Sequence, residues 1–546
     1  MCEIMKAKTP FLREATGLVR EVKAVDAWIF GVMSISLGTG IAFTYTLGPA
    51  LFPGGSITLA IAIFSVILVF KDLLYSQLGT AMPRSGGEYV FQARILDFMA
   101  PWAVGNQISY NVIWQGCIYQ ALNGVMIATI GLAPLVLFMG YSTSNQGLLN
   151  FAAWSNTPIG LFIIILASSA LSIGIVAIGI KFYMEKFQRV LFVIGMAEAF
   201  AVMYLFGTND RASFISKFNS FAAPYYPNNP DAYHYIIQTA QSYGINTQFS
   251  WISTLGLMAF VSFALIWSHG IVHNFGETKK ANDLKLYSWV FIAGTLFPAF
   301  FMLVIGWQIV NLAGLDFLTS IGYLAFIQPS TYTIPIPPFH TLIASVLTNN
   351  IWMLILVNGG LLAWALQWST NNSLGYSRLV LALSFDRILP AKLGDVNERL
   401  HSPVNALLMF FVVGAVGFGA LVAFLGLSAA FSAAVLAQIF NFLTSGLAGM
   451  LFPYRKKEIF QASPASRWKI GKLPFVVICG LITFVSQLVL LYTFVAIPGV
   501  GVSDPRALGV VFGVIAFGII YYYAMKYYRK GQGIDFHDLF GSLPPE

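Results

Sequence analysis

Long apolar runs recur along the whole chain and are separated by short polar segments. Most are 20 residues or longer, enough for a helix to cross about 30 Å of hydrocarbon. The pattern predicts an all-α integral membrane protein with 12 transmembrane helices. The predicted spans are Asp26–Phe52, Ile57–Met82, Pro101–Leu132, Pro158–Ile180, Phe187–Gly207, Trp251–Gly276, Leu286–Leu312, Thr341–Trp368, Val404–Leu425, Ala429–Pro453, Leu473–Ile497 and Arg506–Tyr528.

Composition agrees with lipid as the solvent. Of the 546 residues, 57% are hydrophobic and 10% are charged, whereas a soluble domain carries about 25% charged residues. So few charges do not build a water-soluble surface.

The positive charge has a membrane explanation. The net charge is +8, which raises the question of a nucleic-acid partner. Lys and Arg, however, concentrate at both ends and in every second loop, while the intervening loops hold only Arg211, Lys217 and Arg506. This asymmetry predicts cytoplasmic N- and C-termini in a multi-pass plasma (cell) membrane protein, without nucleic acid.

Two predicted spans are interrupted by small polar residues near half depth. The first is interrupted at Gly38-Thr39-Gly40 and the sixth at Ser268-His269-Gly270. Interruptions five spans apart are typical of two inverted five-helix repeats with a binding site between them. The alternative is that these glycines only allow helices to pack closely.

The repeat hypothesis divides the chain into six parts. They are an N-terminal cytoplasmic segment 1–25, a first repeat 26–207, an extracellular loop 208–250, a second repeat 251–453, two further spans within 473–528, and a cytoplasmic tail 529–546.

The interruption in the first span suits a carboxylate. In "SISLGTGIAF" a helix that restarts after Gly-Thr-Gly presents backbone amides at its positive end, and Thr39 adds a hydroxyl. The string resembles the first-helix motif of the amino acid-polyamine-organocation superfamily. "AMPRSGGEYVFQARI", "FALIWSHGIVHNFGETKK" and "SRLVLALSFDRILPAKLGDVNERLHSPVNAL" resemble later segments of that family in the expected order, so the resemblance covers residues 26–453.

The resemblance implies an amino acid permease with the LeuT-like fold of five plus five helices and two C-terminal helices. It also implies alternating access, with the substrate α-carboxylate on the amides of Gly38, Thr39 and Gly40. The α-amino group would meet the carbonyls of Ser36, Phe263 and Ile266. Where the family has glycine and an acidic residue, this chain has Trp267 and His269. Trp267 is either an aromatic gate over the substrate or a lipid-facing or packing residue.

His269 and His273 are four residues apart and are expected to share a helical face. They are interpreted as cavity-lining groups, as ordinary polar contacts between helices, or as metal ligands. The other histidines form no second pair and His-Glu-x-x-His is absent, so we expect no metal and no cofactor.

The coupling ion is left open between H⁺ and Na⁺. Proton-coupled members of the family carry a lysine on helix five, where this chain has Gly195. Glu198, one turn further, is a candidate because a carboxyl group in mid-membrane is costly. Ser369 and Thr370 offer hydroxyls where related folds bind sodium, and His273 is a further coupling candidate.

Charged residues near the inner ends of the spans receive two interpretations. Lys71 and Asp72 are expected to extend toward the cytoplasmic headgroups, the alternative being a role in transport. The candidates for inner-gate ion pairs are Arg84, Glu88, Arg378 and Asp386, and structural salt bridges at the membrane edge are the alternative for them.

The sequence therefore predicts a proton-coupled amino acid transporter with the lipid bilayer as its surroundings. Alternatives are a sodium-coupled, polyamine or organic-cation carrier of the same fold, a channel, and a membrane metalloenzyme built on His269 and His273. The chain contains no glycine loop typical of ATP hydrolysis.

Overall fold

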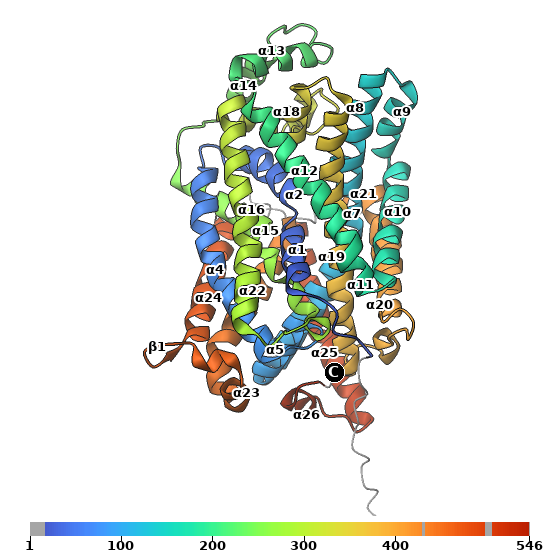
Figure 1. Ribbon diagram of the computed structural model, residues 1–546, viewed down its shortest axis with the longest axis vertical. Coiled ribbons are helices and arrows are strands. Elements are labelled where there is room, and N and C mark those ends of the chain that lie inside the picture. The colour runs from blue at the N-terminus through green and yellow to red at the C-terminus, as the bar shows by residue number, and fades with distance from the viewer. Residues whose placement is uncertain (1–16, 428–431, 497–504, 545–546) are drawn as a thin grey trace, which may run out of the picture.

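Figure 1 shows long helices that stand side by side along the vertical axis. The computed structural model describes residues 17–427, 432–496 and 505–544. Within them the prediction of 12 helices long and apolar enough to cross a membrane is confirmed. These spans are Ala24–Leu51, Ile57–Ala81, Asp97–Thr143, Pro158–Ala177, Ile180–Gly207, Trp251–His273, Leu284–Ala313, Ile351–Phe385, Val404–Leu425, Leu436–Arg455, Phe475–Val495 and Leu508–Gly531.

The spans consist of α-helices, π-helical segments and 3₁₀ turns. The first five contain α1 (Ala24–Ile35), α2 (Leu37–Ala42), η1 (Phe43–Leu47), α3 (Gly48–Leu51), α4 (Ile57–Ala81), α5 (Gly87–Ile95, between spans), η2 (Asp97–Met99), α6 (Ala100–Gln107), η3 (Ile108–Ile118), α7 (Tyr119–Met126), η4 (Ile127–Leu132), α8 (Ala133–Thr143), α9 (Gln146–Ser155, between spans), α10 (Pro158–Ala177), α11 (Ile180–Phe182), η5 (Tyr183–Phe187) and α12 (Gln188–Gly207).

The rest of the chain continues in the same manner. It contains α13 (Arg211–Ala222), α14 (Ala232–Ser242), α15 (Trp251–Leu265), η6 (Ile266–His273), η7 (Phe275–Glu277), α16 (Leu284–Ala313), α17 (Leu315–Phe326), η8 (Pro329–Thr331), α18 (His340–Val346), α19 (Ile351–Phe385), η9 (Ala391–Gly394), α20 (Val404–Met409), η10 (Phe410–Phe418), α21 (Gly419–Leu425), α22 (Ser432–Arg455), α23 (Lys457–Ala462), η12 (Pro464–Arg467), β1 (Lys469–Ile470), β2 (Leu473–Pro474), α24 (Phe475–Ala496), α25 (Pro505–Gly531) and α26 (Phe536–Gly541). The strands β1 and β2 form a short antiparallel pair.

The eighth span differs most from its prediction, Thr341–Trp368. Residues from His340 to Val346 form the separate helix α18, and α19 begins where the Asn350 side chain accepts hydrogen bonds from the amides of Trp352 and Met353. It ends at Phe385, well beyond Trp368. The later part is rich in buried Asn and Ser side chains that face protein, and these lower the hydropathy on which the prediction rested.

Three other predicted limits need comment. The third span is longer than expected, Asp97–Thr143 rather than Pro101–Leu132, because the 3₁₀ turn η2 precedes it and the α-helix α8 continues it beyond Leu132. The predicted start at Ala429 and the predicted end at Ile497 lie outside the described residues.

The segment 208–250, expected to be a loop, contains two helices. The carboxylate of Asp210 caps α13 by accepting from the Ser213 amide at 2.9 Å, as residues at this position commonly do. In α14, Tyr233 stacks on Phe317 of α17 with ring centroids 4.6 Å apart. Helices therefore cover this end of the bundle, at the top of Figure 1.

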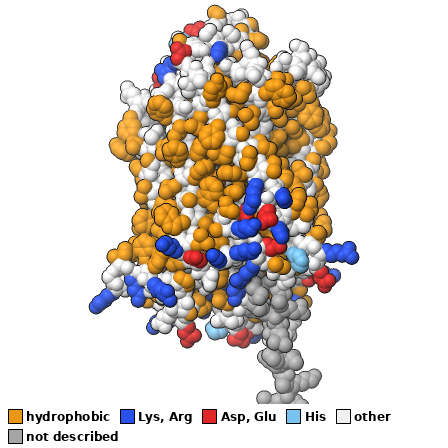
Figure 2. Space-filling model, in the orientation of Figure 1, with side chains coloured by type: hydrophobic (Ala, Val, Ile, Leu, Met, Phe, Trp, Pro, Cys, Tyr) orange, Lys and Arg blue, Asp and Glu red, His pale blue; other side chains and the backbone are white. Residues whose placement is uncertain are grey.

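The surface is apolar over most of its height. Figure 2 shows hydrophobic side chains across the middle of the face, with Lys and Arg gathered toward the lower end, where the chain ends in Figure 1. Large apolar residues such as Trp289 and Trp307 are exposed. An exposed apolar belt of this kind suits contact with lipid rather than water.

Small residues let α24 approach α22 closely. A side-chain carbon added at Gly480 would lie 2.7 Å from the carbonyl oxygen of Gly446 and 2.7 Å from the amide nitrogen of Met450. Backbone atoms cannot give way as a flexible side chain can. The close-packing interpretation of membrane glycines therefore describes this pair of helices.

We expect Gly480→Ala to lower the free energy of unfolding by about 1–3 kcal/mol, the range for overpacked sites. The measurement is the thermal unfolding midpoint of the purified protein in detergent. Gly513→Ala is the control, because nothing lies within 4 Å of a carbon added there and alanine favours a helix over glycine. A midpoint for Gly480→Ala equal to that of the control would contradict the packing argument.

Candidate functional site

The first span is interrupted at Ser36, two residues before Gly38-Thr39-Gly40. Helix α1 ends at Ile35, Ser36 is left-handed with φ 55° and ψ 70°, and α2 begins at Leu37. The Ser36 hydroxyl donates to the Trp364 carbonyl at 3.2 Å. A non-glycine residue in this conformation is strained, and the bond to α19 helps to hold it. The expected position of the break was therefore slightly wrong.

The start of α2 still presents backbone amides. An α-helix leaves its first N–H groups without partners inside the helix, which here are those of Leu37, Gly38 and Thr39. Gly40 differs, because its amide donates to the Ser36 carbonyl at 2.8 Å. The Thr39 hydroxyl donates to the same carbonyl at 2.8 Å. Carboxylate binding here stays a prediction. The backbone amide of Leu37 is a better candidate for binding the carboxylate than that of Gly40, which already has a partner.

Trp364 joins the break to helix α12. A side-chain carbon added at Gly38 would lie 2.5 Å from Trp364 Cδ1, and one added at Gly195 would lie 2.6 Å from Trp364 Cε2. The indole Nε1 donates to Glu198 Oε2 at 3.2 Å, and Glu198 Oε1 lies 3.0 Å from His340 Nε2. The coupling candidate Glu198 is thus one side chain away from the break.

The sixth span changes form at Ile266. Helix α15 ends at Leu265 and residues 266–273 continue as the 3₁₀ helix η6, which contains the predicted break Ser268-His269-Gly270. The Phe263 carbonyl accepts from Trp267 Nε1 at 2.6 Å. All three carbonyls expected to hold an amino group, those of Ser36, Phe263 and Ile266, therefore already have donors from the protein.

His269 and His273 do not share a face. A 3₁₀ helix has three residues per turn, so positions four apart diverge by roughly a third of a turn. His269 Nε2 lies 3.2 Å from Glu88 Oε1, and its ring packs on Tyr75 with centroids 4.3 Å apart. His273 packs on Tyr376 at 5.2 Å. The described residues contain no group of three or more His, Cys, Asp or Glu that could hold a metal ion.

Lys71 does not extend toward headgroups, and that expectation was wrong. Its side chain is 2% exposed, and Nζ lies 2.5 Å from Asp72 Oδ1. The ammonium donates to the Ile266 carbonyl at 2.8 Å and to the Ser268 hydroxyl at 2.9 Å. Hydropathy gave the depth of Lys71 in the span but not the face of α4 on which it lies.

Glu88 lies at the centre of a buried polar cluster. Its carboxylate accepts from the Tyr75 hydroxyl at 2.6 Å, from Asn441 Nδ2 at 2.8 Å and from Asn111 Nδ2 at 3.1 Å. With His269, these groups come from α4, α22, η3 and η6. Glu88 is therefore a neighbour of the unwound sixth span.

The other inner-gate candidates take partners that the sequence did not suggest. Arg378 forms a two-bond ion pair with Glu277 at 2.8 and 3.0 Å, and both side chains are fully buried. Arg94 Nη2 lies 2.7 Å from Asp386 Oδ2. Arg84 donates to the Pro544 carbonyl at 2.8 Å. Arg378 and Asp386 thus join buried ion pairs, Arg378 with Glu277 and Asp386 with Arg94.

On α19, Asn371, which follows the candidates Ser369 and Thr370, forms hydrogen bonds with the first span. Asn371 Nδ2 donates to the Phe30 carbonyl at 3.2 Å and to the Ser34 hydroxyl at 2.8 Å. The Thr370 hydroxyl donates to the Gln367 carbonyl at 2.8 Å within its own helix. Ser369 is buried. Asn371 was missed because no local motif marks it.

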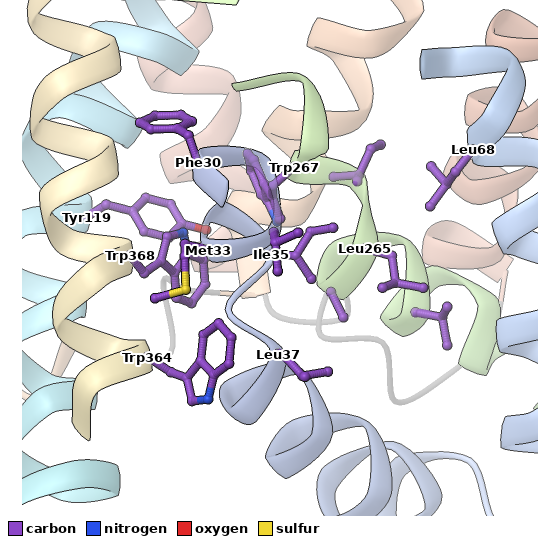
Figure 3. Packing of buried hydrophobic residues seen from close by; sticks show 14 of the residues in the cluster. Phe30, Met33, Ile35, Leu37, Leu68, Tyr119, Leu265, Trp267, Trp364 and Trp368 are labelled. Atoms are coloured by element: carbon purple, nitrogen blue, oxygen red, sulfur yellow. The ribbon is translucent and has the colours of Figure 1, made fainter. Parts of the chain in front are cut away.

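A small cavity lies between α1, η6 and α19. Its volume is about 20 Å³, room for about one water molecule. Figure 3 shows Phe30, Met33, Trp267, Trp364 and Trp368 around the break. The lining residues are Phe30, Ser34, Trp267, Gly270, His273, Trp368, Asn371, Asn372, Gly375 and Tyr376. Trp267 is therefore buried beside the break and does not face lipid.

We expect Gly38→Ala to destabilise the protein by about 1–3 kcal/mol, because the new carbon overlaps the Trp364 ring. The thermal unfolding midpoint in detergent measures the effect. Gly40→Ala is the matched control on the same helix, since a carbon there would lie 3.8 Å from Met302 Sδ, an ordinary contact. Equal midpoints for the two variants would show that Trp364 does not press on Gly38.

Comparison with known proteins gives a family and a fold. A family model described as amino acid permease matches residues 25–520. No curated protein matches. Among solved structures, MhsT in complex with L-phenylalanine is 14% identical with a TM-score of 0.50, over 86% of this chain and 97% of MhsT. At that identity the likeness to MhsT, which has the LeuT fold, concerns the fold alone.

Proposed function

The chain belongs to the amino acid permease family, whose members are transporters rather than enzymes, and on this premise we propose that it is a secondary active, proton-coupled carrier of amino acids. The proposed substrate site lies at the two breaks, between a first repeat 26–207 and a second repeat 251–453. Alternating access would open this site to each side of the membrane in turn. We also propose a plasma membrane location with cytoplasmic termini, supported by the Lys and Arg bias.

The observation that carries the proposal is the pair of broken helices. The amides at the start of α2 suit a carboxylate, and the carbonyls of η6 suit an ammonium. A zwitterion matches both ends of such a site without a fixed buried counter-charge. Apolar and aromatic side chains fill the space between them, which supports a neutral amino acid over a polyamine.

The proposal of proton coupling is supported by the surroundings of Glu198. Its carboxyl group is buried, contacts His340 and Trp364, and reaches Gly38 through the Trp364 ring. A proton taken up or released there changes the bonds that hold Trp364.

We expect at least one neutral L-amino acid to raise the thermal unfolding midpoint of the purified protein, because a ligand that binds only the folded state stabilises it. The panel contains the 20 common amino acids, with putrescine and spermidine as the alternative. Stabilisation by the two amines alone would overturn the proposed substrate class. Counterflow in liposomes then separates a carrier from a channel, since a pore does not support counterflow.

Glu198→Gln should abolish uptake driven by an imposed proton gradient and retain counterflow of the same amino acid. Glutamine keeps the shape of the side chain but does not carry the proton. The measurement is uptake into proteoliposomes with a proton gradient or a sodium gradient. Glu185→Gln is the control, because Glu185 forms an exposed bond with Lys23 at 2.7 Å, of a kind worth little. Proton-driven uptake by Glu198→Gln equal to wild type would contradict the assignment.

A further inference from the structure

The Ile266 carbonyl holds an ammonium that belongs to the protein itself. Lys71 Nζ donates to it at 2.8 Å, and His269 Nδ1 lies 2.9 Å from the same oxygen. A carbonyl oxygen only accepts hydrogen bonds, so the Nδ1 contact requires a proton on that nitrogen. Since a carbonyl oxygen has two lone pairs, these two donors saturate it.

A substrate ammonium therefore needs one of the two donors to leave. His269 is also held by Glu88 at 3.2 Å and by the ring of Tyr75. Lys71 is the donor that can withdraw at lower cost, because its ammonium also contacts Asp72 at 2.5 Å and the Ser268 hydroxyl at 2.9 Å. A displaced Lys71 would remain paired, which avoids an isolated buried charge.

The acceptor that would keep Lys71 is itself fixed. Asp72 Oδ1 accepts from the Ser268 hydroxyl at 2.6 Å, and Asp72 Oδ2 accepts from the Thr295 hydroxyl at 2.6 Å. These bonds reach α4 from η6 and α16. Asp72 can therefore hold the Lys71 ammonium whether or not Ile266 is occupied.

We propose that Lys71 is an internal ligand of the unwound sixth span and that an amino acid binds by replacing the Lys71 ammonium with its own at the Ile266 carbonyl. This inference rests on the proposed function. It makes Lys71 a residue that sets substrate affinity. The exchange also breaks one of the bonds between α4 and η6 on binding, so occupancy of the site bears on how firmly η6 is held to α4.

The test compares the wild type with the double variant K71M/D72N. Removing both charges avoids leaving Asp72 alone, and asparagine keeps polar partners for Ser268 and Thr295. The dissociation constant of the best-binding L-amino acid from the panel should fall roughly tenfold, because the carbonyl no longer has to be vacated. The analogue of that amino acid without its α-amino group should bind both proteins equally, because it has no ammonium to bond to the Ile266 carbonyl.

Ser76→Ala is the control for general loosening of α4. Ser76 lies about one turn along the same helix, and its hydroxyl contacts that of Ser288 on α16 at 2.9 Å. The dissociation constants of Ser76→Ala for the amino acid and for its deaminated analogue should match those of the wild type. If the double variant does not fold, Ser268→Ala removes one partner of Lys71 and should shift amino acid affinity while leaving the deaminated acid unchanged.

The outcomes are distinguishable. Amino acid binding that is unchanged or weaker in a folded K71M/D72N protein overturns the exchange at Ile266 and leaves the proposed function standing. An equal gain for the amino acid and the deaminated acid also overturns it, because the effect would not depend on the ammonium. If no amino acid binds the wild type, the proposed function fails and the inference fails with it.

Discussion

The need to satisfy backbone groups away from water governs the centre of this protein. A bilayer offers no water to an unwound segment, so each freed carbonyl needs a donor from protein or from a water-filled cavity. The central cavity has room for about one water molecule. The donors at Ser36, Phe263 and Ile266 accordingly come from Thr39 and Gly40, from Trp267, and from Lys71 with His269. The broken helices are stable in this form because protein groups donate the hydrogen bonds that these freed carbonyls need.

Buried charges follow the same logic and tie distant segments together. The Arg378–Glu277 ion pair joins α19 to η7, and the Arg94–Asp386 ion pair joins α5 to the end of α19. The contact between the Glu198 carboxyl group and His340 joins α12 to α18. Each charge would be costly if it were left alone in a low-dielectric interior. A rearrangement that separated one of these pairs would need a replacement partner, which restricts the motions open to the bundle.

The sequence predicted well where each residue lies along a membrane span, but it predicted poorly which neighbour each side chain contacts. The 12 spans follow from hydropathy because crossing lipid demands apolar length, and the breaks were located to within about two residues by their small polar composition. The direction in which Lys71 points depends on which face of α4 meets η6, and a nearly all-apolar span carries no periodicity that reveals it. The partners of Arg378 and Asp386 lie about 100 and about 290 residues away, and local motifs do not encode such pairings.

Trp364 connects the carboxylate end of the proposed site to the proposed proton site through two hydrogen bonds and the close packing of its ring. Its carbonyl holds Ser36, its ring fills the space left by Gly38 and Gly195, and its indole nitrogen holds Glu198. Because interiors are close-packed, the ring has little room to move unless α2 or α12 moves with it. A change in the bonds of Glu198 would therefore reach the amides of α2 through one rigid side chain. Lys71 acts at the ammonium end through its hydrogen bond to the Ile266 carbonyl, so each end of a bound zwitterion would contact a segment that a different side chain holds.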